Sequence, residues 1–104
     1  MPQAILNGNV IAEADETEVL HIEGRVYFPP SSVDIELLRD SPTPYTCPWK
    51  GECQYFSVKD QVSGEWLQDR AWTYRTPFDS AIARVGADFS NYVAFWKEVS
   101  ALSV

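Results

Sequence analysis

Short apolar runs separated by turn-forming residues are the feature that most limits what this chain can fold into. The apolar runs Gln3–Leu6 and Val10–Ala12 flank an Asn-Gly pair, Asn7-Gly8. This pair predicts a hairpin because both turn residues tolerate a positive φ. Similar runs follow along the chain, and most of them are shorter than an ordinary helix. The sequence therefore predicts a mainly β fold.

Four more strands are predicted on the same grounds. The run Glu18–Glu23 alternates between apolar and polar residues, and a glycine separates it from Arg25–Phe28. The runs Glu52–Lys59 and Trp66–Tyr74 are longer, and a turn near Ser63-Gly64 joins them. We expect these two longer strands to form the central hairpin of the fold.

Three other segments are less regular. Tyr92–Trp96 is apolar almost throughout, which predicts a strand in the middle of a sheet. Asp40–Tyr45 contains two prolines and is expected to be a surface loop. Ser31–Leu38 fits either a short helical turn or a strand, and the sequence leaves both open.

One short helix is predicted near the C-terminal end. Thr76 is a suitable N-cap, Pro77 fits the first helical position and Gly86 is a suitable stop. The apolar residues between them have the spacing of a face packed on a core, and they are Phe78, Ala81, Ile82 and Val85.

Composition and charge narrow the class of protein. A chain of 104 residues is expected to form one domain, 1–104, and its 45% of hydrophobic residues suits a globular core. It has no apolar run of membrane-spanning length and no signal-like N-terminus, so we expect a soluble, cytoplasmic protein. The net charge of -7 argues against nucleic acid or an anionic membrane as a partner, because both require clustered Lys and Arg.

The chain offers few ligands for a metal ion. Cys47, Cys53 and His21 are fewer than the roughly four Cys or His ligands of a structural zinc site. We therefore expect no metal, and nothing in the sequence indicates another cofactor. Without a secretory signal the cysteines are expected to be reduced thiols, with Cys53 as a small buried residue.

The segment Thr46–Cys53 holds the densest chemistry of the chain. Pro48 and Gly51 predict a sharp turn into the following strand, and this structural role would already account for the motif. Alternatively, Lys50 favours the thiolate of Cys47, which would make that thiol a nucleophile, and the free amides of the turn hold an anion. The residues favour the structural interpretation and leave the chemical one open.

Aromatic and polar side chains share one side of the predicted strand Trp66–Tyr74, provided that the strand is unbroken. They are Trp66, Gln68, Arg70, Trp72 and Tyr74. Aromatic walls with few polar groups are typical of small-molecule sites, and an aromatic core with Arg70 at its rim is the alternative. Glu23 and His21 would share one face of another strand, which suits acid–base chemistry, although such neighbours commonly have no role.

Five segments carry a resemblance to a known family. In chain order they are N-G-N-V-I-A-E, E-G-R-V-Y-F-P-P, T-C-P-W-K-G-E-C-Q-Y-F-S-V, A-W-T-Y-R-T-P and V-A-F-W. They resemble the domain-of-unknown-function 427 family over nearly the whole chain, and T-C-P-(aromatic)-K-G is the most specific element. The resemblance implies a single compact curved sheet or barrel-like core, comparable to the β-tent folds without their metal-binding CxxC pairs. A nucleotidyltransferase-like label is attached to the family, but this chain lacks the Gly-Ser motif and paired aspartates of that chemistry.

We expect the protein to bind a small ligand with an anionic group in an aromatic-lined pocket. The candidate catalytic residues are Cys47, Lys50 and Glu23, and the candidate ligand-binding residues are Tyr27, Arg70, Trp72 and Tyr74. All of them should line one cavity, and the sequence does not decide whether a reaction is catalysed. The alternative is a protein-interaction or homodimerising module, which a flat apolar patch in place of a concave pocket would favour.

Overall fold

Strands dominate the computed structural model, which describes residues 1–102. In chain order the strands of this part are β1 (Gln3–Leu6), β2 (Asn9–Glu13), β3 (Leu20–Ile22), β4 (Arg25–Tyr27), β5 (Leu38–Cys47), β6 (Gly51–Lys59), β7 (Trp66–Thr73), β8 (Val93–Phe95) and β9 (Ser100–Leu102). The helices are the 3₁₀ turns η1 (Pro30–Ser32) and η2 (Ile35–Leu37) and the α-helix α1 (Asp79–Val85). The predicted mainly β class with one short helix is confirmed. None of these helices is long and apolar enough to cross a membrane.

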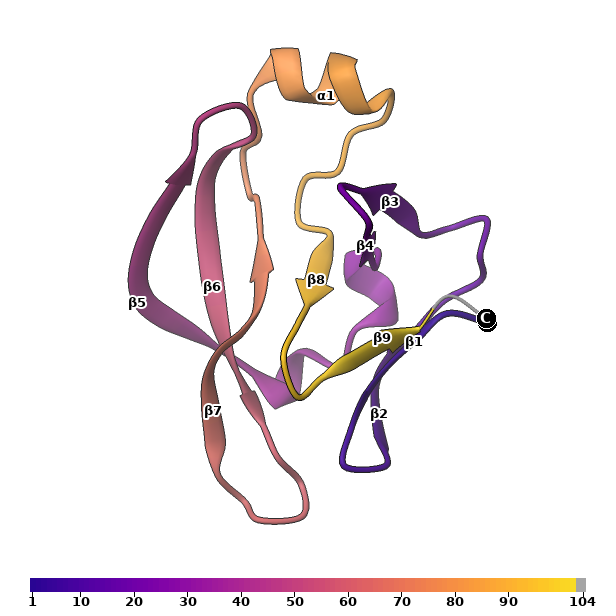
Figure 1. The fold of residues 1–104 in the computed structure, drawn as a ribbon, viewed down its shortest axis with the longest axis vertical. Helices are drawn as coiled ribbons and strands as arrows, with labels where there is room; N and C mark the ends of the chain where they lie inside the picture. Colours follow the sequence, from indigo (N-terminus) through magenta and orange to yellow (C-terminus); the bar gives the residue numbers. More distant parts are fainter. Residues whose placement is uncertain (103–104) are drawn as a thin grey trace.

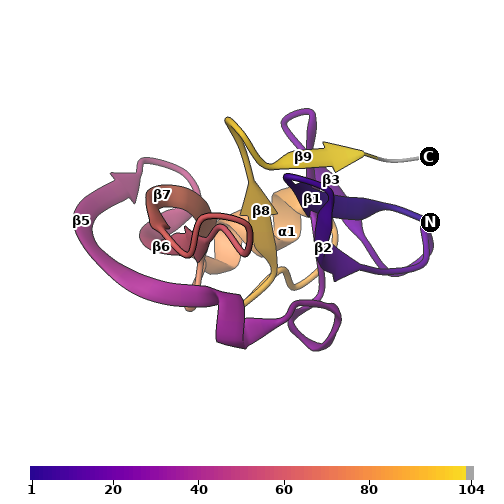
Figure 2. The ribbon, with the colours of Figure 1, turned by 90° about the horizontal axis from the view of Figure 1, so that it is seen from below.

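The strands of residues 1–102 form several antiparallel sheets instead of the expected single curved sheet or barrel. Their orders are β2-β1-β9, β3-β4 and β5-β6-β7-β8. Figure 1 shows the long strands β5, β6 and β7 along one side, the small sheets along the other, and α1 across one end. Seen from below in Figure 2, β5 curves around the outside of its sheet. Hairpins pair locally, and isolated bridges such as that between Phe28 and Val93 connect the sheets without closing them into a barrel in the described part.

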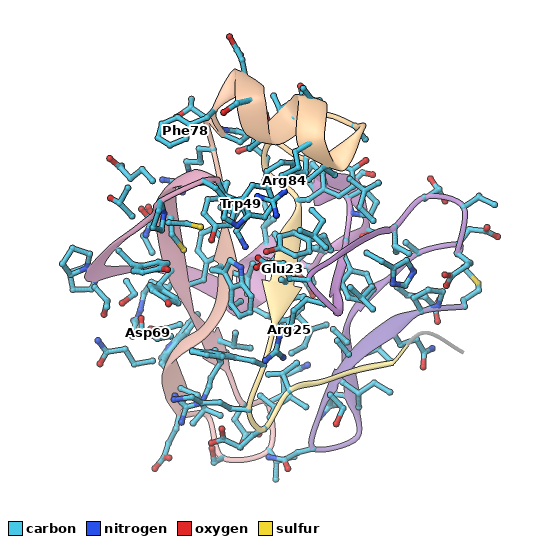
Figure 3. The ribbon with its side chains drawn as sticks, turned by 45° about the horizontal axis from the view of Figure 1, so that its top comes forward. Glu23, Arg25, Trp49, Asp69, Phe78 and Arg84 are labelled. Carbon is cyan, nitrogen blue, oxygen red and sulfur yellow. The ribbon has the colours of Figure 1, made fainter. Side chains whose placement is uncertain are left out.

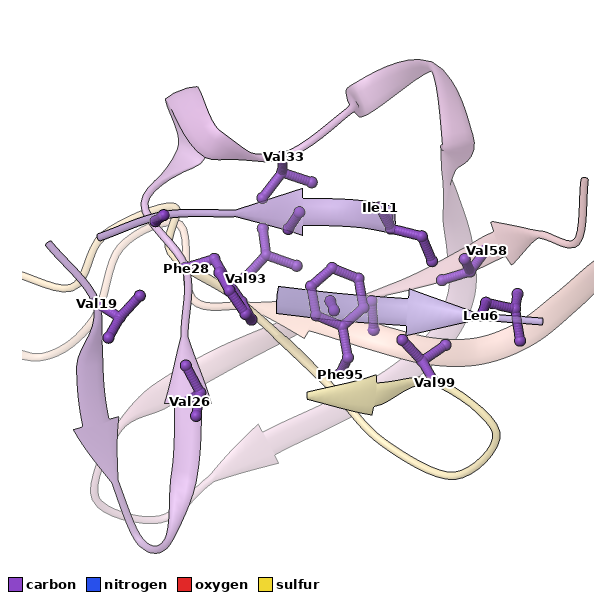
Figure 4. Packing of buried hydrophobic residues seen from close by; sticks show 14 residues of the cluster. Leu6, Ile11, Val19, Val26, Phe28, Val33, Val58, Val93, Phe95 and Val99 are labelled. Atoms are coloured by element: carbon purple, nitrogen blue, oxygen red, sulfur yellow. The ribbon is translucent and has the colours of Figure 1, made fainter. Parts of the chain in front are cut away.

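Both faces of the four-stranded sheet contact a hydrophobic cluster, and alternate residues of its strands face two different clusters. On β6, Phe56 and Val58 pack against the first cluster, whereas Tyr55 packs against the second. Figure 4 shows the first cluster, in which residues of the small sheet such as Leu6 meet Val58 and Phe95. The second cluster is rich in aromatic residues. The sheet therefore separates an aliphatic core from an aromatic one.

The hairpins predicted for β1–β2 and β6–β7 are confirmed, and the structure shows that β3 and β4 form an antiparallel hairpin as well. Asn7 and Gly8 turn the first hairpin with φ values of 49° and 81°. Glu23 and Gly24 turn the second with φ values of 53° and 76°. This second turn places Glu23 at the tip of the β3–β4 hairpin.

The prediction of a surface loop over Asp40–Tyr45 is wrong, because this segment belongs to β5. The pairing of β5 with β6 continues on both sides of it, with a shift of register between Asp40 and Pro44. β5 is an edge strand, where a proline can be accommodated without breaking the hydrogen bonds of a central strand. The prolines therefore interrupt the pairing locally and do not end the strand.

The helix begins later than predicted. α1 starts at Asp79 with Phe78 as its N-cap and without a side-chain cap, so the N-cap role predicted for Thr76 is wrong. The residues before Asp79 stay extended, since the Phe78 amide donates a hydrogen bond to the Lys50 carbonyl at 3.0 Å. Gly86 follows the helix in the left-handed conformation, with a φ of 85°, as predicted.

The irregular segments differ from their predictions in smaller ways. β8, predicted within Tyr92–Trp96 for the middle of a sheet, lies at the end of the four-stranded one. Its outer edge is covered by Phe28, whose backbone exchanges hydrogen bonds of 2.8 and 2.9 Å with Val93.

The undecided segment Ser31–Leu38 contains η1 and η2. β9 was not predicted, because three residues carry little pattern and its partner β1 is distant in sequence.

Gly51 holds the turn between β5 and β6 in a conformation that other residues rarely adopt. Its φ is 118°, and a Cβ at this position would lie 3.5 Å from the Phe78 nitrogen. The hydrogen bond between Phe78 and Lys50 fixes the other side of the same turn. The turn therefore holds the backbone of Lys50 in one place.

We expect Gly51→Ala to lower the free energy of unfolding by about 1 to 3 kcal/mol, because a side chain strains a backbone with this φ. Gly64→Ala is the matched control, since Gly64 has a φ of 79° and open space around it. Urea unfolding followed by tryptophan fluorescence measures both variants. Equal losses for Gly51→Ala and Gly64→Ala would show that the β5–β6 turn is not specially constrained.

Candidate functional site

A cavity of about 370 Å³ opens on the aromatic face of the four-stranded sheet. We call it the Lys50 cavity, and its lining consists of Glu23, Tyr45, Cys47, Lys50, Cys53, Tyr55, Trp72, Tyr74 and Trp96. The lining is mostly aromatic, and its charged members are Lys50 and Glu23. The cavity therefore combines apolar walls with one ion pair.

Distant parts of the chain build this cavity. The end of β5 and the turn after it, same-side residues of β6, the end of β7 and the segment after β8 supply most of the lining. The turn of the β3–β4 hairpin adds Glu23 from the other side. In Figure 3, Glu23 lies near Trp49 and Arg84 below α1, with Arg25 farther from the helix. Contacts between these segments exist only in the folded chain.

Lys50 brings a buried positive charge to the cavity. Its side chain is 8% exposed, and its ammonium donates a hydrogen bond to Oε1 of Glu23, whose side chain is 55% exposed. Burial alone would lower the pKa of Lys50, but the hydrogen bond to Glu23 and the proximity of Tyr27 outweigh it and raise that pKa. The hydrogen bond from Lys50 lowers the pKa of Glu23. At neutral pH the pair is therefore an ammonium and a carboxylate.

Three aromatic rings form the wall beside this ion pair. Trp72 meets Trp96 edge-to-face with 5.3 Å between ring centroids, and Tyr55 lies stacked on Trp96 at 6.4 Å. The Trp96 indole donates a hydrogen bond to the Asp69 carbonyl at 2.6 Å, and the Trp72 indole donates to the Tyr27 hydroxyl at 3.1 Å. Because both indole N–H groups have partners, the rings are fixed and offer the cavity apolar surface.

The thiols of the cavity are free and buried. Cys47 and Cys53 both line it without a disulfide. Burial raises the pKa of the Cys53 thiol to about 11, so this thiol is neutral at physiological pH and a poor nucleophile. Burial also raises the pKa of the Tyr74 hydroxyl, which therefore remains a neutral hydrogen-bonding group.

The structure brings together most of the site residues predicted from the sequence. Glu23, Cys47, Lys50, Trp72 and Tyr74 all line the Lys50 cavity. Tyr27 is buried behind the wall, where its hydroxyl accepts from Trp72 and burial raises its pKa. Lys50 and Cys47 thus lie on the same side of the sheet as Trp72 and Tyr74, as a single site requires.

Arg70 does not line the cavity. Its guanidinium pairs with the Glu98 carboxylate, at 2.7 Å from Nε to Oε1. Its expected place beside Trp72 and Tyr74 required an unbroken strand. The strand is irregular just before Arg70, because Asp69 has a φ of 60° and the pairing of β6 with β7 shifts register there. Sequence alternation could not reveal this irregularity.

The expectation that His21 and Glu23 share one strand face is also wrong, because β3 ends at Ile22. His21 lies on β3 and its Nε2 is 2.7 Å from a carboxylate oxygen of Glu16. Glu23 lies in the turn after β3, with a positive φ that directs its carboxylate to Lys50. The two side chains therefore have different partners, Glu16 for His21 and Lys50 for Glu23.

Sequence reasoning did not assign Tyr45, Tyr55, Cys53 and Trp96 to the cavity. The alternation of β6 had placed Cys53 with Tyr55, but it could not tell which face meets the site. Trp96 follows β8, and the hydrogen bond from its indole to the Asp69 carbonyl holds its ring at the cavity. Asp69 itself combines a positive φ with a buried carboxylate oxygen that lacks a hydrogen-bond partner.

Metal ligands do not gather at this site. Within residues 1–102, no group of three or more His, Cys, Asp or Glu side chains is placed to hold an ion. The absence of zinc remains a prediction for elemental analysis of the purified protein.

The chain belongs to the family described as domain of unknown function (DUF427), whose model matches residues 2–104. The family resemblance inferred from the five sequence segments is therefore confirmed. A comparison with curated proteins finds no match. The description of the family states no activity, so any function has to be argued from the geometry of the site.

We expect the Cys53 thiol to react slowly with iodoacetamide in the folded protein. A pKa of about 11 in place of 9.0 reduces its thiolate at pH 8 about 100-fold, and burial slows the reaction further. In a Cys47→Ser variant Cys53 is the only thiol, and mass spectrometry gives its alkylation rate with and without urea. A folded-state rate similar to the rate in urea would contradict the burial of Cys53.

We expect Glu23→Gln to lower the free energy of unfolding at pH 7 by about 1 kcal/mol. It leaves the buried Lys50 ammonium without a carboxylate, although the exposure of Glu23 screens part of the interaction. Glu98→Gln is the matched control and should cost less, because its partner Arg70 is more exposed than Lys50.

The difference in the free energy of unfolding between Glu23→Gln and Glu98→Gln should also depend on pH. The folded pKa of Glu23 lies below its ordinary value of 4.5, so its stabilising effect is present above that pH and is lost as the pH falls through the folded pKa. Urea unfolding at pH 7 and at pH 3 measures both variants and the unaltered protein. An equal cost for Glu23→Gln and Glu98→Gln at pH 7 would contradict a buried, paired Lys50.

Proposed function

We propose that this protein binds a small molecule with a planar apolar part and an anionic group in the Lys50 cavity. The observation that carries the proposal is the buried ammonium of Lys50, which opens into a cavity with aromatic walls. Burying a cation costs free energy. A buried cation that neither contacts a metal nor supports the backbone therefore commonly has a role in binding or catalysis.

The size and lining of the cavity suit such a ligand. A volume of about 370 Å³ lies within the range of small-molecule sites, which are typically apolar with a few fixed polar groups. The rings of Tyr55, Trp72 and Trp96 provide flat surfaces for an apolar group. Lys50 and the neutral Tyr74 hydroxyl supply hydrogen-bond donors for the polar end.

The geometry supports binding better than it supports a reaction. A raised pKa keeps Lys50 protonated, so its amine is neither a nucleophile nor a base at neutral pH. The raised pKa of Cys53 likewise keeps that thiol protonated. Cys47 and Glu23, predicted as catalytic candidates, line the cavity beside Lys50, and the proposal gives them no chemical step.

The alternative, a protein-interaction or homodimerising module, would use another part of the surface. A groove of about 270 Å³ lies on the other side of the sheet, and we call it the Ile35 groove. It is lined by Pro30, Val33, Ile35, Leu38, Asp40, Phe56, Thr73, Arg75, Asn91 and Val93. Its charged residues, Asp40 and Arg75, already neutralise each other at 3.1 Å. The Lys50 cavity is the better candidate site because its charge is buried.

We expect naphthalene derivatives to bind in the Lys50 cavity of the unaltered protein. Their affinity for Trp96→Leu should be at least about tenfold lower, since this change removes one aromatic wall. The probes are 2-naphthoate and its neutral amide, 2-naphthamide, and isothermal titration calorimetry measures both. Trp66→Leu is the matched control, because Trp66 is a half-buried tryptophan that stacks on Arg39 outside the cavity.

A second variant keeps the test informative if Trp96→Leu does not fold. Tyr45→Ala alters the exposed rim of the cavity and should weaken both probes with little effect on stability. The proposed function is contradicted if neither probe binds the unaltered protein, or if Trp66→Leu weakens binding as much as Trp96→Leu does. Light scattering on the same samples shows whether the chain self-associates, as the interaction-module alternative requires.

A further inference from the structure

We infer that the carboxylate of Glu23 occupies the place of the ligand's own anionic group, and that the ligand is an aromatic carboxylate that displaces Glu23 from Lys50. This inference rests on the proposed function and deepens it. It names the chemical class of the ligand and gives Glu23 a role as an internal competitor. Four observations on the described residues support it.

The two partners of the ion pair differ in their freedom to separate. Lys50 is 8% exposed, whereas Glu23 is 55% exposed at the tip of the β3–β4 hairpin. Glu23 can therefore move its carboxylate into water at low cost, while Lys50 has to keep an anionic partner inside the protein. An incoming carboxylate would supply that partner.

A positive charge is available to Glu23 after it leaves Lys50. Arg84 stacks on Trp49 with 4.3 Å from its guanidinium carbon to the ring centroid. It lies close enough to Glu23 to help lower the pKa of that carboxylate, after the larger effect of Lys50. Within residues 1–102 Arg84 has no ion-pair partner of its own.

Arg25 lies beside the aromatic wall of the cavity. The guanidinium of Arg25 lies 5.8 Å from the ring centroid of Trp72 and 5.9 Å from that of Trp96. In the described part of the chain Arg25 also lacks an ion-pair partner. Arg25 thus lies beside the aromatic wall and Arg84 lies near Glu23, although the whole chain has a net charge of -7. The carboxylate of Asp69 is a negative charge near the cavity, since it adds to the effect of burial in raising the pKa of Cys53 and of Tyr55.

These cations also exclude the other ligand that aromatic walls commonly bind. Tryptophan rings form cages for ammonium groups through cation–π interactions. Here Arg25 already lies over Trp72 and Trp96, and Lys97 lies 4.9 Å from the ring centroid of Trp96. A cationic ligand would be repelled by these groups, whereas an anionic one would be attracted.

The carboxylate of Glu23 indicates the size and charge of the ligand's own anionic group, because that group takes its place beside Lys50. Lys50 is the only cation that lines the cavity in the described residues, and it holds one carboxylate. A second carboxylate of the same size and charge can accept the same hydrogen bond. The aromatic walls then favour a ring attached to that carboxylate.

The experiment compares three probes that share a naphthalene ring and carry an anionic, a neutral or a cationic group. They are 2-naphthoate, 2-naphthamide and 2-naphthylmethylammonium, titrated calorimetrically into the unaltered protein, Glu23→Gln and Glu98→Gln. We expect the unaltered protein to bind the carboxylate at least about tenfold more tightly than the amide, and the ammonium most weakly.

Glu23→Gln should tighten 2-naphthoate about three- to tenfold, because the competing carboxylate is removed, and should change 2-naphthamide less than about twofold. Glu98→Gln should leave both affinities unchanged, since it removes a similarly exposed carboxylate outside the cavity. Unchanged or weaker binding of 2-naphthoate to Glu23→Gln overturns the displacement of Glu23. Tightest binding of the ammonium probe overturns the carboxylate class.

A second measurement needs no substitution. The pKa of Glu23, followed by ¹³C NMR of its carboxyl carbon, should rise toward its ordinary value when saturating 2-naphthoate takes its place at Lys50. A pKa that stays lowered in the complex overturns the inference while leaving the proposed function intact. If none of the three probes binds, the proposed function fails first.

Discussion

The turn that carries Lys50 under an aromatic sheet face is the constraint on which the rest of the site depends. Gly51 adopts a φ of 118°, and the Phe78 amide holds the Lys50 carbonyl, so the backbone of the turn is fixed from both sides. The ammonium is consequently buried and needs an anionic partner, which Glu23 provides from the β3–β4 hairpin. Three separate parts of the chain thus meet at Lys50, namely the turn itself, the segment before α1 and the β3–β4 hairpin.

The four-stranded sheet makes this arrangement possible because both of its faces are covered. One face packs on the mostly aliphatic cluster that includes Val58, which anchors the sheet to the rest of the domain. The other face can then hold a cavity without leaving the sheet unsupported. Hydrogen bonds from the indoles of Trp72 and Trp96 fix the wall of that cavity, so its shape does not depend on a bound ligand.

Local sequence patterns predict the first hairpin and the separation of β3 from β4 well, since Asn7-Gly8 and Gly24 act within their own turns. They also predict that the segment around Lys50 and the strand end at Trp72 belong to one site. They fail where distant segments decide the geometry. Arg70 leaves the site because of the irregularity at Asp69, and the helix starts late because Phe78 bonds to Lys50. The pattern of Cys53 and Tyr55 fixes which residues share a side of β6, but not that this side faces the cavity.

A crystal structure of the protein with 2-naphthoate tests most directly whether the Lys50 cavity is a binding site for anions. The expected result is a carboxylate beside the Lys50 ammonium, a naphthalene ring against Trp72 and Trp96, and a Glu23 side chain turned toward solvent. A ligand seated in the Ile35 groove would contradict this view of the site. The same holds for a ligand that enters the Lys50 cavity with its carboxylate directed away from an unbroken ion pair between Lys50 and Glu23.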